Sequence, residues 1–200
     1  MNIIPSILVR TKEELIEKVR ALEPHFEKAH LDIADGIFVP NTTIDNLGDL
    51  ETNLEFSVHL MVSKPENHIA KWLGLVTSIT FHAEATQKHI EVIEAIKEGE
   101  CEVGIALNPK TPHSAIADFV NLVDFVHFMT VEPGFYGGTF LPEVIDKIAD
   151  FHFYYPDKLI VVDGGVTPEN IDKLTEAGAM EFVVGSALDR FKLKIRNPKR

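Results

Sequence analysis

The sequence contains a single cysteine, Cys101, among its 200 residues. One thiol excludes an internal disulfide framework and a cysteine-based zinc site. Long hydrophobic runs are lacking too, since no apolar run approaches the roughly 18 residues that a membrane span needs. No basic and apolar leader precedes the first apolar run, so we expect no signal peptide. These absences predict a soluble protein with a cytoplasmic location.

Positive charge is also scarce. The chain has 19 Lys and Arg against 31 Asp and Glu, a net charge of −12. Neutralisation of phosphates by Lys and Arg dominates affinity for nucleic acid, so we expect neither nucleic acid nor an acidic membrane surface as a partner. A small phosphorylated ligand is compatible with this charge, because backbone N–H groups can hold a single phosphate.

A short apolar run recurs eight times along the chain, in most cases followed by a polar, helix-like stretch. Thr11 and Glu14 have the spacing of a capping box at the start of the first helix. Strands that alternate with helices indicate a parallel sheet, and eight units indicate an α/β fold of the (β/α)₈ TIM-barrel type, as one domain over residues 1–200. The apolar runs lie at residues 2–8, 29–33, 56–62, 76–81, 102–107, 123–130, 159–162 and 181–184.

Such a barrel normally has about 250 residues, so this one must be compact. We expect a shortened second helix, of two or three turns at residues 45–53, and a short last helix at residues 187–193. Further helices are expected to open near Pro65 and Pro112. The alternative architecture is an open, doubly wound sheet with fewer strands.

Polar residues stand at the carboxyl ends of all eight predicted strands, where barrel enzymes carry their catalytic groups. A random scatter of polar residues would not fall so consistently at strand ends. The predicted ring consists of Ser6, His30, Asp32, His59, His82, Asn108, Thr130, Asp163, Gly185 and Ser186.

Two histidines and two aspartates of this ring form a candidate metal site. His30 and Asp32 are two residues apart on a strand, so their side chains share one face. His59 ends the third strand and Asp163 the seventh. Imidazole and carboxylate ligands suit Zn²⁺, Mn²⁺ or Fe²⁺. A structural His–Asp pair inside the barrel is the competing interpretation.

Glycine clusters follow strands six, seven and eight, at residues 134–138, 164–165 and 185. Phosphate-binding barrels use the loops after the last strands in this way, since glycines let backbone N–H groups approach the anion. Ordinary turn chemistry is the alternative explanation for each cluster taken singly.

Six motifs in this order resemble the ribulose-phosphate 3-epimerase family, over residues 3–190. The blocks H-x-D-x-x-D-G-x-F-V-P-N and M-T-V-x-P-G-F are highly specific in combination. The motifs are I-P-S-I-L at 4–8, H-L-D-I-A-D-G-I-F-V-P-N at 30–41, V-H-L-M-V at 58–62, L-N-P-K-T-P at 107–112, M-T-V-E-P-G-F at 129–135 and V-D-G-G at 162–165.

The resemblance implies a (β/α)₈ isomerase of carbohydrate metabolism that interconverts D-ribulose 5-phosphate and D-xylulose 5-phosphate, and that forms homo-oligomers. It implies one divalent metal ion (Zn, Fe, Mn or Co) on His30, Asp32, His59 and Asp163. Asp32 and Asp163 would be the two catalytic carboxylates that exchange the C3 proton. The implied substrate-binding residues are Ser6, His59, Met61, Met129, Gly134, Phe135, Tyr136, Gly137, Gly164, Gly165, Gly185 and Ser186.

Four residues depart from the family pattern. Ala34 stands where the family usually has methionine, Ile37 where it has histidine, Tyr136 where it has glycine and Gly138 where it has glutamine. The lost methionine suggests a looser pocket, so a 3-epimerase of a six-carbon ketose phosphate, such as allulose 6-phosphate, is one alternative. A non-catalytic sugar-phosphate-binding barrel is another, against which the retained aspartates argue.

Three further residues receive structural predictions. His127, inside the sixth apolar run, is expected to be a satisfied core residue. For His82, a place behind the metal ligands and a hydrogen-bonded structural role are equally favoured. Asp35, beside Gly36, is expected to form a turn rather than to take part in catalysis.

Overall fold

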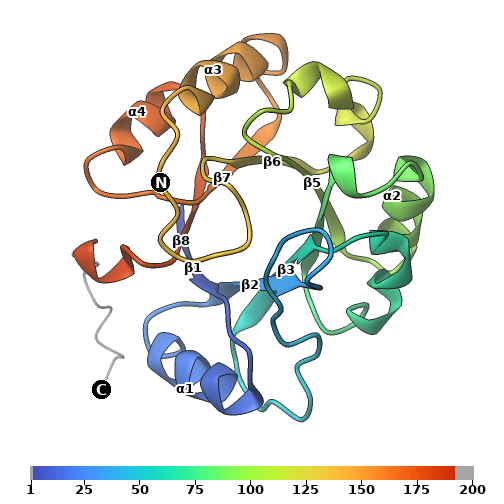
Figure 1. Ribbon diagram of the computed structural model, residues 1–200, viewed down its shortest axis with the longest axis vertical. Coiled ribbons are helices and arrows are strands. Elements are labelled where there is room, and N and C mark those ends of the chain that lie inside the picture. The colour runs from blue at the N-terminus through green and yellow to red at the C-terminus, as the bar shows by residue number, and fades with distance from the viewer. Residues whose placement is uncertain (1, 192–200) are drawn as a thin grey trace.

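Eight parallel strands form a closed barrel in the computed structural model, which describes residues 2–191 (Figure 1). Each strand pairs with the next, and β1 pairs with β8 through registers such as Ile4 with Val183. The closed barrel confirms the predicted fold and excludes the open sheet. The strands are β1 (Asn2–Ile7), β2 (Lys28–Ala34), β3 (Glu55–Met61), β4 (Ser78–His82), β5 (Glu102–Leu107), β6 (Phe125–Met129), β7 (Leu159–Asp163) and β8 (Glu181–Val184).

Helices surround the barrel (Figure 1). The first begins with the predicted capping box: Thr11 accepts a hydrogen bond from the backbone of Glu14, whose side chain accepts from the Thr11 N–H. None of the described helices is long and apolar enough to cross a membrane. The α-helices are α1 (Lys12–Leu22), α2 (His89–Glu98), α3 (Val144–Tyr154) and α4 (Ile171–Glu176), and 3₁₀ turns lie at Pro65–Asn67, Ile69–Lys71, Ala83–Ala85, His113–Ile116, Val120–Leu122 and Leu188–Arg190.

The connection between β2 and β3 lacks the predicted helix, since residues 45–53 form no helix. The Ile44 N–H donates to the Val9 carbonyl, which ties the start of this stretch to the end of β1. Gly48 has a φ of +58°, a left-handed conformation that interrupts a right-handed helix. Irregular chain therefore covers this side of the barrel, with Leu47 and Leu54 buried beneath it.

The helices expected near Pro65 and Pro112 are also reduced, to pairs of 3₁₀ turns. At the end of the described chain, the expected short helix is the single 3₁₀ turn Leu188–Arg190, and residues 192 and 193 of that prediction lie outside the described residues. Short elements of this kind explain how 200 residues close a complete barrel.

The barrel interior is polar for much of its length. Strand residues that face outward, such as Leu31, Val58 and Phe128, are apolar and buried beneath the helices. The alternating inward positions are instead polar, and they are also buried. Buried donors and acceptors need hydrogen-bond partners, and these hydrogen bonds fix the orientation of the side chains in the site. The buried polar residues of the strands include His30, Asp32, Ser57, His59, Ser78, Thr80, His82, His127 and Asp163.

Candidate active site

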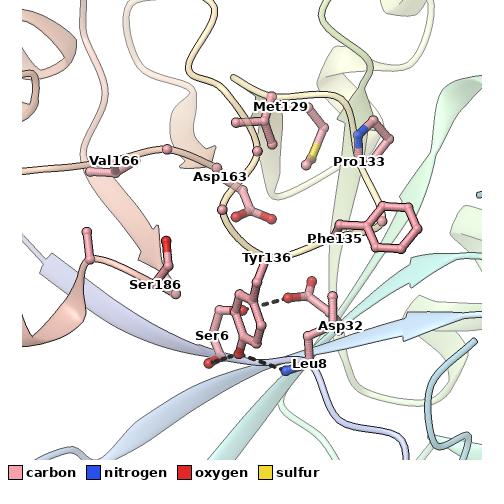
Figure 2. A pocket seen from close by; sticks show the side chains of 18 of the residues that line it. Ser6, Leu8, Asp32, Met129, Pro133, Phe135, Tyr136, Asp163, Val166 and Ser186 are labelled. Atoms are coloured by element: carbon pink, nitrogen blue, oxygen red, sulfur yellow. Dashed lines mark hydrogen bonds between the residues drawn. The ribbon is translucent and has the colours of Figure 1, made fainter. Parts of the chain in front are cut away.

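A pocket lies at the carboxyl ends of the strands, where the sequence predicts the site (Figure 2). Asp32 and Asp163 both point their carboxylates into it (Figure 2). Every residue expected to bind substrate lines this pocket except His59, which lies beneath it. The lining residues are Ser6, Leu8, Asp32, Met61, Met129, Val131, Pro133, Gly134, Phe135, Tyr136, Gly137, Gly138, Asp163, Gly164, Gly165, Val166, Gly185, Ser186 and Ala187.

The two aspartates differ in their surroundings. Burial opposes ionisation of Asp32, but its imidazole neighbours His59 and His30 and a hydrogen bond from Ser6 outweigh it and lower its pKa. The Ser6 hydroxyl donates to Asp32 Oδ2 over 2.7 Å. Burial, followed by repulsion from Asp32, raises the pKa of Asp163. The site thus holds one carboxylate that ionises readily beside one that retains its proton more strongly.

His59 is held in one tautomer by a chain of two residues behind it. Burial is the largest influence on Glu84 and raises its pKa, but hydrogen bonds from His82 and Thr111 outweigh burial and hold the pKa at about 2. His82 is neutral, because burial lowers its pKa to about 4, so its Nδ1–H donates to Glu84 Oε2 over 3.3 Å. His82 Nε2 then accepts from His59 Nε2–H over 2.9 Å. His59 Nδ1 therefore carries a lone pair, and it faces the aspartates.

His30 is held in the complementary way. The Ser57 hydroxyl donates to the Ala29 carbonyl, so its oxygen accepts from His30 Nδ1–H over 2.9 Å. Burial lowers the pKa of His30 to about 4, so the imidazole is neutral and Nε2 carries a lone pair. This Nε2 atom is buried and has no hydrogen-bond partner among residues 2–191.

Acceptor atoms therefore converge under the pocket without donors between them. His59 Nδ1 lies 3.2 Å from Asp32 Oδ1 and 3.6 Å from Asp163 Oδ2, and His30 Nε2 lies 3.7 Å from Asp32 Oδ1. Lone pairs that face one another in a buried site require a cation among them. The residues present fit a divalent metal ion, since two imidazoles and two carboxylates are a common donor set and their outer hydrogen bonds fix the ring orientations.

His127 is a buried core residue of β6, as expected, but only one of its ring nitrogens has a partner. Its ring lies inside the barrel beside the metal candidates, with Nε2 3.3 Å from Asp163 Oδ2, and Nδ1 has no hydrogen-bond partner among the described residues. Single donor atoms of four buried residues lie within 4.8 Å of one another and could hold a metal ion: His30, His59, His127 and Asp163. The two-residue spacing to Met129, which lines the pocket, was the one available signal that His127 faces inward.

The glycine loops approach the pocket with backbone conformations that favour glycine. Gly134, Gly137, Gly164 and Gly165 all have positive φ. A Cβ atom on Gly164 would meet Val131 at 2.3 Å, so the backbone could not come this close with a side chain present. Loops of this kind direct backbone N–H groups at an anion.

Tyr136 joins the loop after β6 to the end of β1. Its hydroxyl donates to the Ser6 carbonyl over 2.7 Å and accepts from the Leu8 N–H over 2.9 Å (Figure 2). Its φ is not positive, so tyrosine is not strained at this position, while Gly134 and Gly137 on either side do have positive φ. The ring also approaches Gly185, where a Cβ atom would lie 2.4 Å from Tyr136 Cε1.

Ala34 does not line the pocket. It is buried against Val39 and Met61, with Leu8 and Phe38 packed on the same cluster, so neighbouring side chains occupy the space around it. Ile37 is largely exposed. Neither departure from the family pattern enlarges the pocket in this structure.

Asp35 forms a turn, as expected. Its Oδ1 atom accepts from the backbone N–H groups of Ile37 and Phe38, and its Oδ2 atom accepts from Ser63 N–H over 2.7 Å. These bonds join the loop after β2 to the loop after β3. Asp35 is absent from the pocket lining and holds the rim of the site in place.

The comparisons with known proteins point to one family. Similar proteins include the ribulose-phosphate 3-epimerases of Schizosaccharomyces pombe, 38% identical over 94% of this chain and 86% of the relative, and of Escherichia coli K12, 34% identical over 93% and 88%. A chloroplastic ribulose-5-phosphate-3-epimerase of Arabidopsis thaliana is 38% identical over 92% of this chain and 70% of its own.

The solved structures show the fold alone. A mutant tryptophan synthase α-subunit from Pyrococcus furiosus superposes with a TM-score of 0.69 at 16% identity, over 93% of this chain and 87% of its own. The model of the ribulose-phosphate 3-epimerase family matches residues 2–189. With eight strands, a glycine-rich mouth and paired aspartates in the positions described, this chain belongs to the ribulose-phosphate 3-epimerase family.

Proposed function

We propose that the protein is a metal-dependent isomerase that inverts C3 of D-ribulose 5-phosphate to give D-xylulose 5-phosphate. The observation that carries this proposal is the pair of aspartates in one pocket whose pKa values shift in opposite directions. Binding alone needs no such pair, whereas epimerisation needs a base on one face of C3 and an acid on the other.

The reaction begins at the proton on C3, which is α to the C2 ketone. The ionised Asp32 accepts this proton, and negative charge spreads over the two adjacent oxygens as an enediolate. Asp163, which retains its proton more strongly, then donates to the opposite face of C3. Asp32 then holds a proton and Asp163 is ionised, which is the state that acts on D-xylulose 5-phosphate in the reverse direction. Proton exchange with water after product release restores the starting state for another forward turnover.

His30, Asp32, His59 and Asp163 would hold the divalent ion. When bound, this ion supplies Lewis-acid stabilisation of the charge that develops on the substrate oxygens. The Glu84–His82 chain and Ser57 keep the two imidazoles turned toward it. The candidate ions are Zn, Fe, Mn and Co.

The rest of the pocket would bind the sugar phosphate. Backbone groups of Gly164, Gly165, Gly185 and Ser186 would hold the phosphate, with Gly134, Phe135 and Gly137 closing the opposite side. Met61 and Met129 would pack against the carbon chain and exclude water from C3. Ser6 would orient Asp32 through its hydrogen bond. A single barrel domain, a homo-oligomeric state and a cytoplasmic location stay predictions.

The test follows deuterium at C3. Incubation with ribulose 5-phosphate in D₂O should give xylulose 5-phosphate labelled at C3, and EDTA should abolish both product and label until metal is restored. Absence of exchange and of product, even with added Zn²⁺, Mn²⁺, Fe²⁺ or Co²⁺, would exclude the proposed activity. The same assay with allulose 6-phosphate measures the six-carbon alternative directly.

A further inference from the structure

His127 adds a third imidazole to the candidate metal site. It is fully buried on β6, and its ring centroid lies 4.8 Å from that of His59 and 5.4 Å from that of His30. Its Nε2 atom is 3.3 Å from Asp163 Oδ2. The register of β6 on β7 produces this placement, since His127 lies beside Val161, two residues before Asp163.

The tautomer of His127 decides what its Nε2 atom can do. The ring is fully buried, which disfavours the charged form of an imidazole, so it carries one proton. Its buried Nδ1 atom has no hydrogen-bond partner within the described part of the chain. With His30, Ser57 and Ser78, the residue lines a cavity of about 220 Å³ at the amino-terminal end of the barrel.

A cavity of this size, lined by polar groups, has room for water, which can accept a hydrogen bond from Nδ1–H. In that tautomer the lone pair of Nε2 faces Asp163 Oδ2. In the other tautomer Nε2–H donates to this oxygen over 3.3 Å, and a bound cation would replace that proton. His59 Nδ1 lies 3.6 Å from the same oxygen, so two imidazole nitrogens approach one carboxylate oxygen.

We infer that His127 is a further nitrogen ligand of the metal, and that three imidazoles therefore hold the ion together with Asp163 and Asp32. The inference rests on the proposed metal-dependent activity and adds a residue to that site. One donor atom each of His30, His59, His127 and Asp163 lies within 4.8 Å of the others. Ligands bonded at about 2.1 Å lie no more than about 4.2 Å apart, so only a small adjustment is needed.

The consequence is a change in metal preference. Imidazole nitrogen suits Zn²⁺ and Co²⁺, whereas Mn²⁺ is better served by oxygen donors. A third imidazole should therefore raise the affinity for Zn²⁺ more than the affinity for Mn²⁺. The ratio of the two affinities reports on His127 separately from catalysis.

The experiment compares His127→Leu and His127→Asn with Phe128→Leu. The second variant keeps a polar side chain inside the barrel in case leucine prevents folding. The control residue is the next on β6, fully buried on the outer face, so its truncation perturbs the same strand without touching the site. Zn²⁺ and Mn²⁺ affinities are measured by chelator competition, and Co²⁺ binding by visible absorption.

Both His127 variants should lose Zn²⁺ affinity by at least about tenfold with a much smaller change for Mn²⁺, and their Co²⁺ bands should shift. The control should keep the wild-type ratio and spectrum. An unchanged Zn²⁺ to Mn²⁺ ratio and cobalt spectrum in a folded His127 variant would overturn the inference and leave the proposed epimerase standing. A wild-type protein that binds none of the three ions would overturn both.

Discussion

The Nε2 atoms of His59 and His82 lie 2.9 Å apart, so one of these buried imidazoles must donate a hydrogen bond to the other. Because His82 Nδ1–H is directed at Glu84, His59 is the donor. The lone pair that His59 presents to the aspartates thus depends on Glu84, a residue absent from the pocket lining.

Replacement of Glu84 by glutamine should therefore weaken metal binding. Glu84 accepts from His82 with one oxygen and from the Asn108 N–H with the other, and an amide keeps only one of these acceptors. We expect Zn²⁺ affinity to fall about 10- to 100-fold, with activity recovered at high metal concentration. Glu91→Gln, at an exposed ion pair on α2, is the matched control. Equal affinity in Glu84→Gln and wild type would refute the dependence.

Asp32→Asn and Asp163→Asn should each abolish epimerisation, with a loss of at least about 10²- to 10⁴-fold. Because the two carboxylates serve opposite faces of C3, each variant should retain at most the exchange of deuterium from one of the two pentulose phosphates. Proton NMR in D₂O, started separately from ribulose and xylulose 5-phosphate, follows this asymmetry, and metal content is measured in parallel. Asp45→Asn, outside the pocket, should behave as wild type. A fully active Asp32→Asn or Asp163→Asn variant would contradict the two-carboxylate assignment.

Tyr136→Phe removes two hydrogen bonds and leaves the ring in place. The loop after β6 then loses its connection to the Ser6 carbonyl and the Leu8 N–H, at a cost of about 1 kcal/mol. If this energy is needed to order the loop around the phosphate, KM rises about fivefold while kcat changes little. Steady-state kinetics measure the split, with the exposed Tyr154→Phe as control. An unchanged KM would show that the loop is held by its other contacts.

Asp35→Asn should make stability depend less on pH. Burial raises the pKa of Asp35, but hydrogen bonds from three backbone N–H groups outweigh it and hold the pKa below the ordinary value of 3.8. A depressed pKa contributes stability above pH 3.8 that is lost as pH falls through the folded value. We expect a loss of about 1 kcal/mol at pH 7 in the variant, a figure that allows for solvent screening. Urea unfolding should show the difference from wild type shrinking towards pH 3, and a constant difference would contradict the assignment.

Local sequence signals predicted much of the fold. The capping box depends only on Thr11 and Glu14, which are close in the sequence, so the start of α1 could be predicted. The order of the strands followed from their alternation with polar stretches. The irregular chain at residues 45–53 could not be predicted, because it depends on the hydrogen bond from Ile44 to Val9, which lies just after β1.

The candidate site likewise contains residues that could be predicted from the sequence and residues that could not. Asp32 and Asp163 belong to motifs and strand ends, so their convergence could be expected from barrel geometry. His127 stands alone in an apolar run, and its approach to Asp163 depends on how β6 pairs with β7. Glu84 likewise matters only through the side chain of His82. Contacts of this kind require three-dimensional register, which no spacing within one strand reveals.

The missing helix between β2 and β3 has a consequence for hydrogen exchange. Local opening is cheapest where irregular chain rather than a packed helix covers a sheet, and here that wall carries His30, Asp32 and His59. An ion that binds only the closed form lowers the population of open states. Addition of Zn²⁺ should therefore slow amide exchange most in residues 28–34 and 55–61, and least in β5, which contributes no proposed ligand. In this fold, the ion would take over part of the protection that a helix supplies elsewhere in the barrel.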